Sequence, residues 1–93
     1  MIVLRMEIHL RLYASGSLKD KRVVLRSLLE RLRNRFNVGV AEIGAQDQWQ
    51  RIELGIAGVA SDRKVLDSEL EAITRFLDRD VRFEMVERLV EYH

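Results

Sequence analysis

Apolar and polar side chains alternate without a break at the start of the chain. The apolar members occupy every even position: Ile2, Leu4, Met6, Ile8, Leu10 and Leu12. A period of two is typical of a strand that buries one face. We therefore predict a strand over residues 2–13. A turn over residues 14–17 follows, in which Ser17 is placed to cap a helix, with Asp20 completing an imperfect capping box.

The pattern then changes to helical spacing. Apolar residues recur on one face at Leu18, Leu25, Leu28, Leu29, Leu32 and Phe36. This spacing predicts a helix over residues 18–36. A short strand over 38–43, a polar hairpin connection over 44–50 and a strand over 51–60 come next.

A second helix is expected over residues 62–78, capped by Ser61. Its apolar stripe comprises Leu66, Leu70, Ile73 and Leu77. The last strand, over 81–92, changes phase at Val86, and a β-bulge there would explain the change.

The order strand–helix–strand–strand–helix–strand favours the ferredoxin-like α+β fold. With right-handed crossovers it gives one antiparallel sheet in the order 4-1-3-2, with both helices on one face. A chain of 93 residues supplies one core, so we expect a single domain over 1–93. We expect one shared core built from Leu4, Met6, Ile8, Leu10, Leu28, Leu54 and Leu70.

Charge is distributed unevenly along the chain. The formal net charge is only +1, but residues 1–40 carry nine basic and three acidic side chains (+6), and residues 41–93 carry seven and twelve (−5). The first helix accounts for most of the excess. A basic surface of this kind suits nucleic acid, although attraction to the acidic second half, or simple solvation of the helix, would explain it too.

Composition excludes several classes of function. The chain has no cysteine, which removes disulfides, thiol nucleophiles and cysteine-ligated metals. The two histidines, His9 and His93, have no metal-ligand spacing, so we expect no metal and no cofactor. No apolar run is long enough for a membrane span, and we expect a cytoplasmic protein with no membrane partner.

Three ordered motifs resemble one known family. They are the run over 17–22 (Ser-Leu-Lys-Asp-Lys-Arg), the runs over 34–38 and 40–42, and Gln46-Asp47 with Trp49-Gln50-Arg51 and Leu54-Gly55. Together they resemble the YlxP-like family of small bacterial proteins, a domain of unknown function. The resemblance implies a ferredoxin-like fold in the bacterial cytoplasm. It also implies a link to RNA or the ribosome, since in some bacteria the family's gene lies among genes for transcription termination, translation initiation and ribosome maturation. It implies no catalytic residue.

The predicted topology brings scattered residues to one edge. The third strand begins beside the end of the first, and the first helix starts there too. The candidate binding residues are Arg11, Tyr13, Lys19, Lys21, Arg22, Arg26, Trp49 and Arg51. Aromatic rings stack on bases and cations contact phosphates. The leading interpretation is a non-catalytic RNA- or ribosome-associated binding module. Alternatively, Trp49 folds over the end of the sheet and the charges only solvate it.

Two other functions remain open. The helix-free face of the sheet carries small and β-branched residues, which suits a homodimer, unless the charged residues between them form ion pairs in water. The turn at Ser15-Gly16-Ser17 has the location of an acylphosphatase phosphate loop but lacks its arginine, so a small hydrolase is the least favoured alternative.

Overall fold

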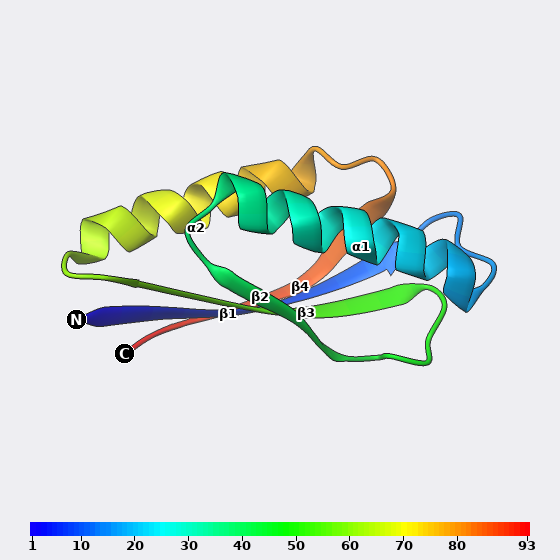
Figure 1. Cartoon of the computed structure of the whole chain (residues 1–93), viewed down its shortest axis with the longest axis horizontal. Coiled ribbons are helices and arrows are strands. Elements are labelled where there is room, and N and C mark those ends of the chain that lie inside the picture. Colours follow the sequence, from blue (N-terminus) through cyan, green and yellow to red (C-terminus); the bar gives the residue numbers. More distant parts are fainter.

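Six elements follow one another in the computed structural model, which describes residues 1–93. They are β1 (Ile2–Leu12), α1 (Leu18–Arg35), β2 (Gly39–Gly44), β3 (Arg51–Ala60), α2 (Arg63–Asp78) and β4 (Phe83–Tyr92). The strands form one antiparallel sheet in the order β2-β3-β1-β4, and both helices cover the same face (Figure 1). This arrangement confirms the predicted ferredoxin-like α+β fold.

The core lies between the sheet and the helices. The even-numbered residues of β1 face the helices, and those from Leu4 to Leu12 are buried, whereas Ile2 is partly buried. Ile8 of β1 pairs with Leu54 of β3. Sixteen buried apolar residues form one cluster, and six of the seven expected core residues belong to it. The seventh, Leu70, is partly buried and packs against the cluster.

The predicted irregularity in the last strand is present. His9 pairs with Glu87 and Leu10 with Met85, so Val86 is the additional residue of a bulge between β1 and β4. The bulge shifts the inward phase of β4, which allows Phe83 at one end and Val90 at the other to pack on the same core.

Several element boundaries differ from expectation by one or two residues. Asp62, not Ser61, caps α2, because its carboxylate accepts the Lys64 N–H at 2.9 Å. β2 begins one residue late, at Gly39. β4 begins at Phe83, two residues late, because the Asp80 carboxylate takes the Arg82 N–H at 3.0 Å and keeps this segment in a turn.

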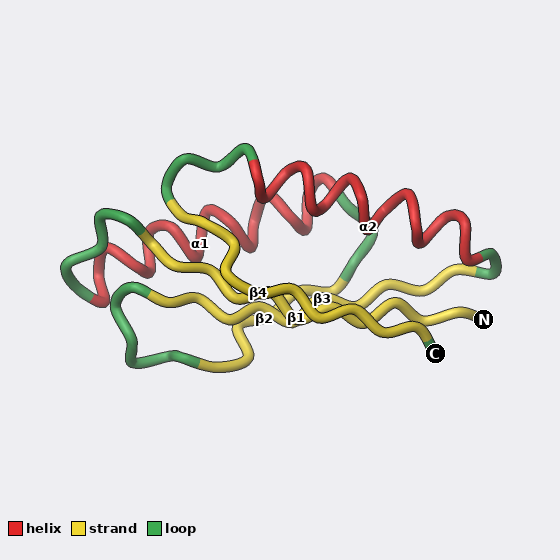
Figure 2. Tube along the Cα trace, turned by 180° about the vertical axis from the view of Figure 1, so that it is seen from behind, coloured by secondary structure: helices red, strands yellow, loops and turns green.

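The molecule is elongated, with a longest extent of 42 Å. Its two ends lie together at one tip, where the Val3 and His93 backbones exchange two hydrogen bonds of 2.9 Å. The loop before α1 and the loop between β2 and β3 lie together at the opposite tip (Figure 2). Neither helix has the length and apolar character needed to cross a membrane.

Candidate functional site

Trp49 lies in the loop between β2 and β3, at the tip opposite the chain ends. Its side chain is 53% exposed, so it does not fold over the core. It lines an open hollow of about 630 Å³ together with Arg11 and Arg51, which are direct partners in the β1–β3 register. The expected meeting of these three residues is therefore confirmed, and the hollow presents a free aromatic surface beside two cations.

The two arginines of this hollow are not free charges. Arg11 approaches Glu84 to 2.5 Å on β4, and its guanidinium lies 5.3 Å from the centre of the Tyr13 ring. Arg51 lies 4.0 Å from Glu53. Tyr13 is exposed, but it lines another hollow, on the β4 side of the molecule. The predicted edge is thus divided, and Tyr13 and Trp49 do not form one aromatic platform.

Lys21 is not available to a ligand, which corrects the sequence interpretation. Its side chain is 2% exposed, its ammonium donates to the Ala45 carbonyl at 2.5 Å, and Glu42 Oε2 lies 3.1 Å away. Glu42 Oε2 is buried and accepts no hydrogen bond, so the ion pair alone compensates its charge. Position 21 lies seven residues before buried Leu28, on the inward face of α1.

Lys21 instead fixes the loop that carries Trp49. Ala45, the residue it binds, is the only non-glycine residue with a positive φ, 55°, a conformation that costs an L-residue about 1–2 kcal/mol. A second hydrogen bond connects the same loop to the turn before α1. The Gln50 side chain of the loop donates to the Ser15 carbonyl of the turn at 3.4 Å. Sequence reasoning found Trp49 but missed these two anchors.

The exposed cations of α1 form a stripe along one side of the helix. We name this stripe the basic stripe, and its members are Lys19, Arg22, Arg26 and Arg33. Spacings of three, four and seven residues place them on the same side. None has a carboxylate within 4 Å, and Arg33 donates to the Val40 carbonyl at 3.0 Å. Arg33 was absent from the predicted set, although it follows Arg26 by seven residues.

The serine–glycine turn before α1 is occupied by its own side chains. Ser17 accepts the Asp20 N–H at 3.1 Å, and Asp20 accepts the Gly16 N–H at 3.0 Å. These contacts confirm Ser17 as the cap. Because both N–H groups already have partners, the turn offers neither of them to a phosphate, which gives the hydrolase alternative no support here.

The helix-free face of the sheet has a charged half and an apolar half. In the charged half, His9 lies 3.8 Å from Glu53 and 3.5 Å from Glu87, as expected for cross-strand pairing. Arg5 reaches both Glu7 and Glu91. The apolar half contains an open hollow of about 530 Å³, lined mainly by small and β-branched residues of β2 and β3. No group of His, Asp or Glu is arranged to hold a metal ion.

Comparisons with known proteins agree on one relationship. The family model described as "Protein of unknown function (DUF503)" matches residues 3–89. The chain is also similar to the uncharacterized protein YlxP of Bacillus subtilis (strain 168), with 46% identity over 79 residues, which cover 85% of this chain and 83% of the relative.

Proposed function

Since the chain belongs to the DUF503 family, whose function is unknown, we propose that it is a non-catalytic module that binds single-stranded RNA. The proposed contacts are the basic stripe of α1 for the phosphates and the Trp49 ring for a base. The resemblance of its motifs to a family encoded beside translation genes makes ribosomal RNA the first RNA to consider.

The observation that carries the proposal is the lack of partners for the cations of α1. This helix has seven basic side chains, and only Lys21 lies within 4 Å of a carboxylate. Its two acids, Asp20 and Glu30, lie within 4 Å of none of the other six, and Asp20 is engaged at the turn before the helix. Unpaired cations that remain in solvent are available to phosphates without first breaking an ion pair.

The dimensions of the stripe suit a nucleic-acid strand. From Lys19 to Arg33 is fourteen residues, or about 21 Å along the helix axis. This length allows each cation to meet a different phosphate of one strand, because successive phosphates are several ångströms apart. Most of the stripe is arginine, which forms bidentate contacts with phosphate oxygens.

Trp49 adds a contact of a different kind. It is exposed at the tip where α1 begins, and Lys21 and Gln50 hold its loop against that tip (Figure 1). A base stacked on such a ring contributes about 1–3 kcal/mol without sequence preference. Because its loop is already fixed, binding would not have to order it.

A second candidate function is homodimerisation through the apolar half of the helix-free face. Ile43 and Val59 are exposed there by 48% and 56%. Gly55 allows Ile43 to lie flat across β3, since a Cβ at Gly55 would come within 2.7 Å of Ile43 Cγ2. A flat apolar surface favours close approach by another sheet. Sedimentation velocity tests this candidate, and a monomer at every concentration would exclude it.

Titration of the intact protein with oligouridine RNA tests the RNA proposal. Trp49 is the only tryptophan, so its fluorescence reports directly on stacking. We expect quenching on binding, and four phosphate contacts would give a slope of log K against log salt of about −3. Absence of binding at low salt would overturn the proposal.

Two matched double variants localise the contact. Arg22→Gln/Arg26→Gln removes two unpaired cations, and Arg5→Gln/Arg63→Gln removes two that are paired with carboxylates. Both lower the net charge by two. The first should reduce the magnitude of the salt slope by about 1.4, whereas the second should leave it nearly unchanged. Equal effects would mean that the attraction is only overall charge, and the basic stripe would not be the site.

A further inference from the structure

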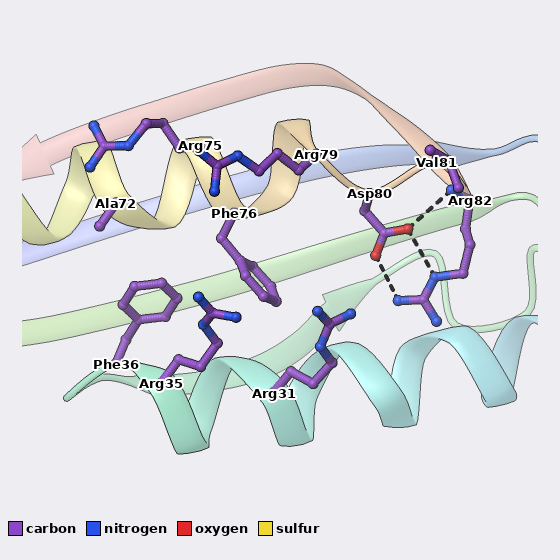
Figure 3. A pocket seen from close by; sticks show the side chains of 10 residues that line it. All are labelled: Arg31, Arg35, Phe36, Ala72, Arg75, Phe76, Arg79, Asp80, Val81 and Arg82. Atoms are coloured by element: carbon purple, nitrogen blue, oxygen red, sulfur yellow. Dashed lines mark hydrogen bonds and ion pairs between the residues drawn. The ribbon is translucent and has the colours of Figure 1, made fainter.

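A second group of arginines surrounds a hollow between the two helices, away from the basic stripe. The hollow has a volume of about 460 Å³ and lies where the C-terminal halves of α1 and α2 pass each other (Figure 3). Its arginines are Arg31 and Arg35 of α1, Arg75 of α2, and Arg79 and Arg82 of the segment before β4. Its apolar part comprises Phe36, Ala72, Phe76 and Val81.

Most of this positive charge is uncompensated. Asp80 is the single acidic residue that lines the hollow, and its carboxylate is bound by Arg82 through contacts of 2.6 and 2.9 Å. These hydrogen bonds from the Arg82 guanidinium lower the pKa of Asp80, so it remains ionised and committed to that arginine. Arg75 is 3.9 Å from Glu71. Arg31, Arg35 and Arg79 have no carboxylate within 4 Å.

Two of the free guanidinium groups are held in place by an aromatic ring. Arg31 and Arg35 lie 4.9 and 5.0 Å from the centre of the Phe76 ring, and in Figure 3 their head groups lie on either side of it. Phe76 is itself fixed by an edge-to-face contact with Phe36, at 5.8 Å between ring centres. A cation held against a ring keeps its N–H donors for other partners.

Helix dipoles explain only part of this arrangement. Cations in the last turn of a helix are stabilised by its partial negative charge, which accounts for Arg35 and Arg75 individually. It does not account for three unpaired arginines around one hollow, where they repel one another. A bound anion would remove that repulsion.

We infer that this hollow binds a small phosphorylated molecule with a flat, partly apolar body, of the nucleotide class. Its volume lies within the usual range for small-molecule sites, about 300–1,000 Å³. The arginines supply planar donors for a phosphate or diphosphate, and Phe36, Ala72 and Val81 supply apolar surface for the body. This site is independent of the RNA proposal, because no residue of the basic stripe lines it.

Calorimetric titration of the full chain with ADP, and separately with inorganic pyrophosphate, tests the inference. We expect ADP to bind with a dissociation constant of about 1 mM or tighter, and about tenfold more tightly than pyrophosphate, because only ADP contacts the apolar surface. No heat with either probe would overturn the inference. Equal affinity for the two would overturn the assignment of the nucleotide class.

Two double variants of one helix provide the matched control. Arg31→Gln/Arg35→Gln should weaken ADP binding by about tenfold or more, and Arg22→Gln/Arg26→Gln should change it by less than about twofold. All four side chains are exposed, so both variants should fold, which circular dichroism verifies. Arg79→Gln, on the other side of the hollow, gives an independent reading.

The opposite result is equally informative. If both double variants weaken ADP equally, the nucleotide is attracted by the general charge of α1 and the hollow is not a site. If oligouridine displaces ADP completely, the hollow is part of the RNA surface and the inference of a separate small-molecule site is wrong.

Discussion

The outer side of α1 and the helix-free face of the sheet both carry many charges, but they use them differently. On the sheet, Arg5 contacts Glu7 and Glu91, and Arg11 contacts Glu84. On α1, six of the seven cations have no carboxylate partner within 4 Å. One surface therefore neutralises itself, and the other remains open to an external anion.

The difference shows that pairing geometry, more than charge content, determines which surface can bind. Adjacent strands bring side chains of opposite sign directly opposite each other, so a sheet readily pairs its charges. A helix pairs charges only three or four residues apart. Of the two acids of α1, Asp20 has no cation at those spacings. Glu30 is four residues from Arg26 and three from Arg33, but it lies more than 4 Å from both guanidinium groups.

The largest effect is expected from the one cation of α1 that is paired. Lys21→Met would leave the buried Glu42 carboxylate and the Ala45 carbonyl without their partner, and removing one half of a buried ion pair costs about 3–5 kcal/mol. Chemical denaturation measures the loss. Arg22→Met, on the exposed side, should change stability by no more than about 0.5 kcal/mol. A small loss for Lys21→Met would place that lysine among the free cations.

Next in size is the contribution of Trp49 to RNA binding. Trp49→Ala should weaken oligouridine binding by about 1–3 kcal/mol, the worth of one stacked base, while the free energy of unfolding falls by less than about 1 kcal/mol. The exposure of the ring is the reason for this separation. Labelled RNA replaces tryptophan fluorescence as the readout. A stability loss of several kcal/mol would instead identify Trp49 as part of the core.

Asp80 gives a smaller, pH-dependent effect. Its pKa lies below the ordinary 3.8, because Arg82 hydrogen-bonds the carboxylate. Its stabilisation is therefore present above about pH 4 and is lost as the pH falls through the depressed pKa. Asp80→Asn should cost about 1–2 kcal/mol at pH 7 and less at pH 3. Denaturation at the two pH values checks this, and a difference independent of pH would contradict it.

The smallest effect concerns the sheet face. A double-mutant cycle on Arg5 and Glu91, with both changed to Ala, should give a coupling of about 0.2–1 kcal/mol, because both side chains are half exposed. Neither change should alter RNA binding. Loss of binding on removal of Arg5 would move the RNA-contacting surface from α1 to the sheet.

Much of the fold followed from the sequence because its periodic patterns are local. The alternation around Ile8 identified the buried face of β1, and the change of phase at Val86 identified the bulge. Boundaries set by single side chains were harder. The choice of Asp62 over Ser61 as a cap, and the turn held by Asp80, depend on hydrogen bonds that a hydropathy pattern does not contain.

The candidate site was less predictable. The expected antiparallel pairing correctly predicted that Trp49, Arg11 and Arg51 lie together. The prediction that Lys21 contacts a ligand was wrong. A basic side chain was expected to be exposed, whereas this position of α1 faces the core. The hollow of Arg31 and Arg79 was missed, because it depends on how far one helix is displaced along the other, and no local pattern encodes that displacement.

The pairing of the Val3 and His93 backbones has a practical consequence for attachment. Both ends of the described chain leave the sheet at the tip farthest from the loop of Trp49 (Figure 1). A linker or solid support joined at either end would therefore present that loop outward. Because the two ends are adjacent, a short peptide could connect residues 1 and 93. The chain could then be circularly permuted, with new termini in another loop, without moving the hollow at Trp49 or the hollow between the helices.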